Sequence, residues 1–110
     1  MAVSSDYLDF VLEQLAPVGP LTSRKMFGGV GLYAQGLFFA VIDDDTLYLK
    51  GDEALGLDFE AAGGTRFAPF GMSAMPYWSA PVEALDEPDV LVDWARRSIA
   101  VAAARKTRKP

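Results

Sequence analysis

The pattern of hydrophobic and polar positions begins with a helical period. Apolar residues within residues 7–15 fall in one arc at 100° per residue, and the acidic residues between them face away. Residues 4–6, Ser-Ser-Asp, place a hydroxyl and an acid where a helix begins. Residues 17–20 contain two prolines and a glycine, which end a helix. The first element is therefore predicted to be an amphipathic helix of about three turns.

The stretch from residue 24 to residue 50 changes to the period of strands. It is predicted to form three consecutive strands, joined by a tight turn at residues 34–36 and an acidic turn at residues 43–45. Residues 37–42 form a continuous apolar run, LFFAVI, which is typical of a central strand covered on both faces. Because the connections are short, neighbouring strands should be antiparallel.

Three glycines interrupt the first of these strands, at Gly28, Gly29 and Gly31. Glycines inside a strand usually mark a bend, a bulge or a close backbone approach. A phosphate-binding loop is the alternative, but another strand follows, and Ala34 stands where a dinucleotide fingerprint needs its third glycine. We expect a bend, and a small-molecule-binding or enzymatic site near residues 24–31 is kept as the alternative function.

The second half of the chain predicts a short helix, two strands and a last helix. Residues 53–62 carry Leu55 and Phe59 on one edge and precede a pair of glycines, which predicts the short helix. Residues 66–70 and 75–79 predict two short strands, and residues 86–88 open the last helix with two acids and a proline.

The expected fold is thus α+β, a two-layer arrangement with an antiparallel sheet of about five strands. The N- and C-terminal helices should pack together on one face of this sheet. The other face should carry the surplus phenylalanine, tyrosine and methionine side chains. An exposed apolar surface of that kind usually indicates association, so we expect a homodimer.

Composition narrows the function classes. The 110 residues are 51% hydrophobic and 23% charged, which indicates one folded domain. Cysteine and histidine are both absent, which removes disulfides, thiolate metal sites, thiol catalysis and the usual neutral-pH base. The three aspartates at residues 43–45 lack the alternate spacing of a calcium loop. We therefore expect no catalytic residue, no cofactor and no metal site.

Charge is unevenly distributed along the chain. Residues 1–95 hold four basic and all fifteen acidic side chains, a balance of −11, while residues 96–110 hold the other six basic ones and no acid. A basic tail could contact phosphate or a protein partner, although it also suits a solvated helix end. These candidate contact residues are Arg96, Arg97, Arg105, Lys106, Arg108 and Lys109.

The domain is predicted to span residues 1–104, and residues 105–110 are predicted to be a disordered basic tail. The acidic body has no helix-turn-helix or zinc motif and is therefore unlike a DNA-binding domain. Only the basic tail keeps direct DNA binding as an open alternative. Aromatic residues near Arg66 could stack on bases, but we expect them to pack within the sheet. No apolar run of 18 residues and no signal peptide is visible, so we expect a cytoplasmic location without membrane contact.

Four motifs in a fixed order carry a family resemblance: RKMFGG at residues 24–29, LYLK at 47–50, MPYW at 75–78 and a tryptophan in LVDWARRSIAVA at 91–102. With them, residues 7–104 resemble the N-terminal domain of the TfoX/Sxy family of competence regulators. We assign structural roles to the motif residues Arg24, Lys25, Met26, Phe27, Gly28, Gly29, Tyr77, Trp78 and Trp94.

The resemblance implies a bacterial, non-enzymatic regulatory and protein-interaction module in the transcriptional control of DNA-uptake genes. It implies action together with a transcription factor such as the cyclic-AMP receptor protein, and a fold like that of the dimeric secretion chaperones. Full-length family members carry a second, C-terminal domain, where this chain ends in RKTRKP. The resemblance therefore implies a stand-alone version of the N-terminal domain.

Overall fold

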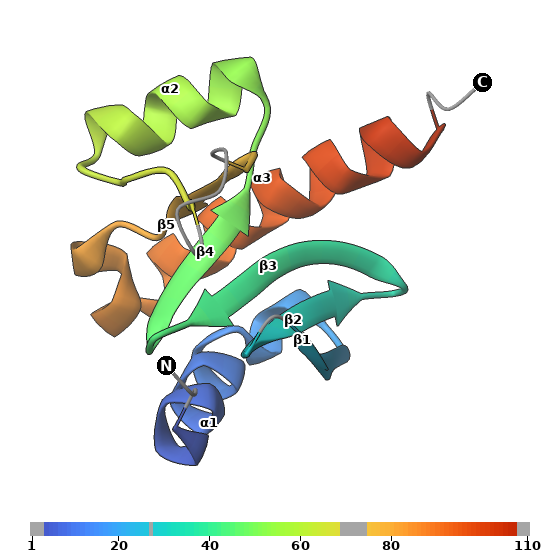
Figure 1. Ribbon diagram of the computed structural model, residues 1–110, viewed down its shortest axis with the longest axis vertical. Helices are drawn as coiled ribbons and strands as arrows, with labels where there is room; N and C mark the ends of the chain where they lie inside the picture. The colour runs from blue at the N-terminus through green and yellow to red at the C-terminus, as the bar shows by residue number, and fades with distance from the viewer. Residues whose placement is uncertain (1–3, 27, 69–74, 108–110) are drawn as a thin grey trace.

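The computed structural model describes residues 4–26, 28–68 and 75–107 of the chain. Its five strands form one sheet in the order β1-β2-β3-β4-β5 with every pair antiparallel, which confirms the α+β prediction (Figure 1). The strands are β1 (Leu21–Met26), β2 (Gly29–Ala34), β3 (Leu37–Asp43), β4 (Thr46–Lys50) and β5 (Tyr77–Ser79). The helices are α1 (Ser5–Gln14), α2 (Glu53–Ala61) and α3 (Pro88–Thr107), with short 3₁₀ turns η1 (Ala16–Val18) and η3 (Val82–Asp86).

The number of strands agrees with the prediction, but their boundaries do not. The glycine-interrupted strand that we expected is two strands, β1 and β2, which reverse at Gly28 with a φ of +78°. Residues 22 and 23, expected to precede the meander, lie inside β1. In the segment expected to form a fourth strand, Arg66 makes only an isolated bridge to Trp78, and residues 69 and 70 lie outside the described residues. Because glycine adopts positive φ without steric cost, Gly28 permits the early reversal.

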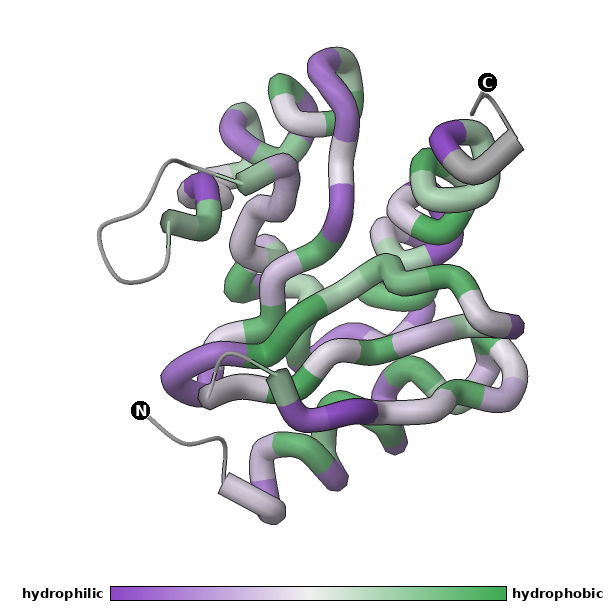
Figure 2. The backbone as a smooth tube through the Cα atoms, turned by 45° about the vertical axis from the view of Figure 1, so that its right-hand side comes forward, coloured by the Kyte–Doolittle hydropathy of each residue, from purple (hydrophilic) through white to green (hydrophobic). Residues whose placement is uncertain are grey.

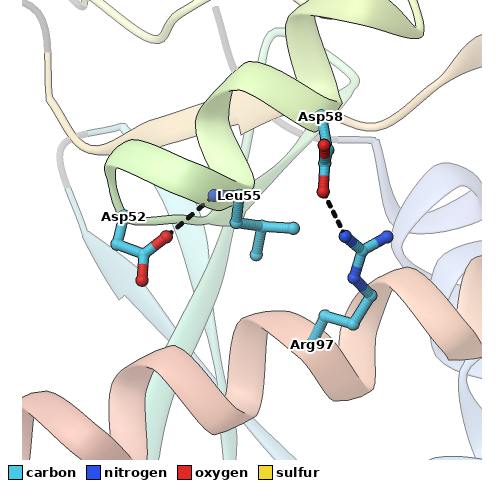
Figure 3. Close-up of polar contacts among 4 residues, drawn as sticks. All are labelled: Asp52, Leu55, Asp58 and Arg97. Atoms are coloured by element: carbon cyan, nitrogen blue, oxygen red, sulfur yellow. Dashed lines mark hydrogen bonds and ion pairs between the residues drawn. The ribbon is translucent and has the colours of Figure 1, made fainter.

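Both predicted tight turns are present, and side chains cap the first turns of α1 and α2. Two residues with positive φ close each hairpin, Gln35 and Gly36 after β2 and Asp44 and Asp45 after β3, as in type I′ turns. The Ser4 hydroxyl accepts a hydrogen bond from the backbone N–H of Tyr7 at 3.1 Å. Figure 3 shows the equivalent cap of α2, where Asp52 Oδ1 accepts the N–H of Leu55 at 2.8 Å.

The main core lies between the sheet and its helices. It joins buried residues of α1, α3 and all strands from β2 to β5, so the two terminal helices cover the same face, as predicted. A register shift opposite Leu32 and Tyr33 leaves Phe39 as an extra residue in β3. This bulge lets Phe39 and Ala40 both enter the core with no exposed surface.

The last helix continues through Thr107, and residues 108–110 lie outside the described residues.

In Figure 2, β1 at the sheet edge carries hydrophilic residues, whereas the central strand β3 is hydrophobic along most of its length. Hydrophilic side chains on an edge strand protect it against pairing with other chains.

Trp78 joins α2 to the sheet through two glycines. A Cβ atom at Gly56 would lie 2.4 Å from Trp78 Cζ2, and one at Gly51 would lie 2.9 Å from Cζ3. The indole Nε1 donates a hydrogen bond to Glu60 Oε2 at 2.8 Å. The indole therefore packs directly against the backbone of α2, and only glycine fits at these two positions.

Gly56→Ala should lower the free energy of unfolding by about 1–3 kcal/mol, because the added methyl group overlaps the indole ring. In an unconstrained helix the same change stabilises by up to about 1 kcal/mol, so the sign is diagnostic. Urea denaturation of single and double variants with Trp78→Leu provides the control. The cost of Gly56→Ala should shrink when the indole is absent, and a cost that persists unchanged would contradict the packing explanation.

Ser98 on α3 is fully buried, and its hydroxyl oxygen has no hydrogen-bond partner in the described part of the chain. An unsatisfied buried hydroxyl costs free energy, and alanine has the higher helix propensity. Ser98→Ala should therefore raise the free energy of unfolding by about 1 kcal/mol in urea denaturation. Ser23→Ala on the exposed edge strand should change it little.

Candidate functional site

The sheet face opposite the helices carries a second apolar cluster. Its buried members are Val41, Phe67 and Tyr77, with half-buried Phe38, Tyr48 and Met75 packed against them. Tyr33 belongs to the same surface because its ring stacks on that of Phe38. Met26 also belongs to it, because a Cβ atom added at Gly31 would meet both Met26 and Phe38. We call this surface the aromatic face. It comprises Arg24, Met26, Tyr33, Phe38, Val41, Asp43, Tyr48, Lys50, Phe67, Met75 and Tyr77.

Ring contacts make the aromatic face continuous across the sheet. Tyr33 and Phe38 stack with centroids 5.1 Å apart, and Phe38 lies 5.5 Å from Tyr77. Tyr48 and Phe67 pack at 4.5 Å. Tyr33, Phe38 and Tyr48 are only half-buried, so they supply accessible apolar area above a buried base.

Positive charge lies at one end of the aromatic face, at Lys50 and Arg105. The Lys50 ammonium donates a hydrogen bond to Tyr77 Oη at 3.3 Å and lies 4.9 Å from the centroid of the same ring. Arg24 lies between the two ends of the face, on β1 opposite Gly31, and its guanidinium is 6.0 Å from the Tyr33 ring centroid. Arg105 acts electrostatically on both Lys50 and Tyr77, so the end of α3 reaches this corner.

Carboxylates occupy the opposite end. Asp43 pairs with Thr46 where β3 and β4 meet, and Lys50 follows Thr46 by four residues. At about 3.3 Å per residue, the two charged ends are roughly 13 Å apart along β4. Asp43 and Asp44 act on Tyr48, between the two ends. The aromatic face thus has an apolar centre, a positive end and a negative end.

Burial shifts the pKa values of three titratable groups on this face. It raises the pKa of Tyr77 to about 12, with Tyr33 adding to the shift and Arg105 opposing it. Burial, followed by the charges of Asp43 and Asp44, raises the pKa of Tyr48. Burial, followed by the charge of Arg105, lowers the pKa of Lys50. Tyr77 therefore remains a neutral phenol at neutral pH and accepts a hydrogen bond from Lys50.

The glycines of β2 meet packing needs. A Cβ atom at Gly29 would lie 2.2 Å from the carbonyl oxygen of Ile42 on the neighbouring strand. One at Gly31 would lie 2.6 Å from Met26 Cε and 2.9 Å from Phe38 Cε1. These contacts agree with the close-approach interpretation. They give no support to the alternative ligand loop at residues 24–31.

The predicted basic contact residues do not form one patch in the described structure. Arg96 Nη2 donates to the carbonyl of Pro17 at 3.1 Å, on the side of η1. Arg97 forms an ion pair with Asp58 of α2 and lies 4.7 Å from the Trp94 ring centroid (Figure 3). Arg105 is exposed near the end of α3. The side chain of Lys106, and Arg108 and Lys109 entirely, lie outside the described part.

The family-motif residues that the structure describes are spread over the first hairpin, β5 and α3. Arg24 and Lys25 are exposed on the edge strand, Gly28 is in the turn, and Met26 and Gly29 pack within the first hairpin. Trp78 and Trp94 contact Phe59 on the helical side, whereas Tyr77 belongs to the aromatic face. Phe27 lies outside the described residues.

Sequence reasoning did not place Lys50 and Asp43 at the two ends of the aromatic face. Period-two alternation in residues 46–50 was the available signal for Lys50, because it places Lys50 on the same face as Tyr48.

The described residues contain no group of three acidic side chains placed to hold a metal ion. None of their helices combines the length and hydrophobicity that crossing a membrane requires.

The raised pKa of Tyr77 predicts a pH dependence of stability. The unfolded chain ionises this phenol near pH 10, whereas the folded chain resists until about pH 12, so the stabilising contribution is complete below pH 10 and lost between pH 10 and 12. Urea denaturation should show this as a slope of at most about 1.4 kcal/mol per pH unit. Tyr77→Phe should lose that part of the slope, while other groups titrate equally in both proteins. Equal slopes would contradict the assignment.

The chain is similar to known proteins over most of its length. Residues 13–102 match the family model of the TfoX N-terminal domain. A part of 50 residues, 46% of this chain, is 38% identical to the DNA transformation protein TfoX1 of Aliivibrio fischeri (strain ATCC 700601 / ES114). The match spans about a quarter, 24%, of that relative's length. Because the family model covers most of the chain, the protein belongs to the TfoX N-terminal domain family.

Proposed function

We propose that this protein is a non-enzymatic regulatory module that works through protein contacts, and that two copies associate through the aromatic face. Family membership supports a competence-related regulatory role, and the name of the relative refers to DNA transformation. The observation that carries the contact proposal is the aromatic face, with half-buried rings at its centre and opposite charges at its ends.

The charge arrangement of this face favours a second copy as its occupant. In a two-fold dimer the same patch on each protomer meets the other in reverse orientation. The positive end, with Lys50, would then oppose the negative end of the other protomer, with Asp43. Half-exposed aromatic rings would supply the apolar centre, and complementary charges would fix the relative orientation.

Lys50 gives a specific reason for this pairing. Its ammonium is partly buried, its pKa is lowered, and it has no carboxylate partner among the described residues. A carboxylate from a second protomer would restore the electrostatic stabilisation that burial removes.

The absence of histidine and cysteine from the sequence supports contact rather than catalysis, because it removes the commonest general base and the easiest nucleophile. The buried phenol on the aromatic face also stays protonated at neutral pH. A phenol with a pKa of about 12 is a poor general base under those conditions.

A charge-reversal experiment tests the dimer and its orientation. Light scattering at micromolar concentration should give the dimer mass for the wild type. Lys50→Glu and Asp43→Lys should each weaken association at least tenfold, because each places like charges opposite one another. The double variant should recover most of the lost affinity, since the two-fold pairing is restored with reversed signs.

Lys25→Glu is the matched control, because Lys25 neighbours Arg24 on β1 but pairs with Val30, a residue of the opposite core. It should leave the mass unchanged. Circular dichroism should establish that each variant is folded. A monomeric wild type, or single reversals without effect, would disprove the proposed dimer.

A further inference from the structure

A cavity of about 470 Å³ lies away from the centre of the aromatic face, between α2, the Arg66 bridge and the end of α3. Its size is in the range of small-molecule sites. Gly51 and Gly56 are part of its wall, and the Trp78 indole forms its floor. Of the lining residues, Arg105 also lies near the positive end of the aromatic face, and the others are separate from the proposed dimer contact.

The floor of the pocket is held rigidly. Trp78 is 4% exposed, stacks near Phe59, and is fixed by its hydrogen bond to Glu60. Because Gly51 and Gly56 have no side chains, the indole lies tightly against α2. A site whose walls are already ordered loses little conformational entropy when a ligand binds.

One wall of the pocket is basic. Arg66 Nε donates to the carbonyl of Met75 at 3.1 Å, and its guanidinium lies 4.8 Å from the Trp78 ring centroid. The backbone contact and the ring fix the guanidinium plane, while its terminal amino groups have no hydrogen-bond acceptor in the described structure. Such a fixed guanidinium suits a carboxylate, which accepts two parallel hydrogen bonds. Arg105 adds a second cation to the pocket.

The lining residues from α2 and its N-cap include three acids. Asp52 and Glu60 each use one carboxylate oxygen within the chain, for the helix cap and for the indole. Glu53 has no hydrogen bond or ion pair within the described ranges, and it is exposed at the pocket. In those ranges no ion pair joins these acids to Arg66 or Arg105. Exposed Leu57 adds an apolar surface beside the acids.

We infer that this pocket binds a small zwitterion of dipeptide size. Its free carboxylate binds to the Arg66 guanidinium, with Arg105 nearby, and its ammonium group binds to the Glu53 carboxylate. An apolar side chain of the ligand packs against Leu57. Charges of both signs line the pocket without being paired with each other, which favours a ligand that carries both signs over a simple anion or cation.

The dipeptide Ala-Leu is a suitable probe. Isothermal titration and tryptophan fluorescence should detect binding, since Trp78 is the pocket floor and the chain has two tryptophans. Ala-Leu amide lacks the carboxylate and N-acetyl-Ala-Leu lacks the ammonium group. Each should bind at least tenfold more weakly, because each loses a charge-assisted hydrogen bond.

Two variants assign the contacts. Arg66→Gln should weaken Ala-Leu about tenfold while leaving the weaker affinity of Ala-Leu amide unchanged. Glu53→Gln, at an exposed position where folding is not at risk, should weaken Ala-Leu but not N-acetyl-Ala-Leu. Arg96→Gln is the control, because that side chain contacts Pro17 away from the pocket.

No binding of Ala-Leu at millimolar concentration would overturn the proposal. Equal affinities of the wild type for Ala-Leu and its amide would also overturn it, because the carboxylate would then play no part. Light scattering of the same samples reports the dimer separately, so failure of either proposal is distinguishable from failure of the other.

Discussion

Burial of β3 on both faces of the sheet is the constraint on which the other features depend. Phe39, Ala40 and Ile42 enter the main core under the helices, while Val41 and Phe38 contribute to the aromatic face. One layer of helices can cover only one face of a sheet. The second face must therefore bury its apolar side chains against one another, and it does so only in part, because the outer rings remain half-exposed. A fold built on this strand has an apolar surface available for contact.

The charges at the ends of the aromatic face follow from strand register. Lys50 lies opposite Tyr77 because β4 and β5 are antiparallel neighbours, and Asp43 lies opposite Thr46 where the second hairpin closes. A shift of one residue in β4 would turn Lys50 and Tyr48 toward the helices. The apolar core residues Leu47 and Leu49 prevent that shift, since they would then lose their burial. The main core thus determines the polarity of the opposite face.

Elements marked by local chemistry could be predicted from the sequence. The caps at Ser4 and Asp52 and the proline start of α3 act within one helical turn, so nearby residues suffice to find them. Strand β1 could not be found in that way. As a solvated edge strand it is exposed on most positions, and it has no hydrophobic period that would separate it from a loop. Only its pairing with β2 makes it a strand.

The candidate sites show the same division. An aromatic second face was predictable from the surplus of apolar residues, but the approach of Arg105 to Lys50 depends on the length and direction of α3. Likewise, Gly51 precedes α2 and Gly56 lies within it, and only the position of Trp78 explains why both lack a side chain. In each case the candidate site brings together residues that are far apart in the chain, so the sequence alone does not show that they meet. Local sequence patterns identify the elements, and the contacts between elements determine which surfaces they present.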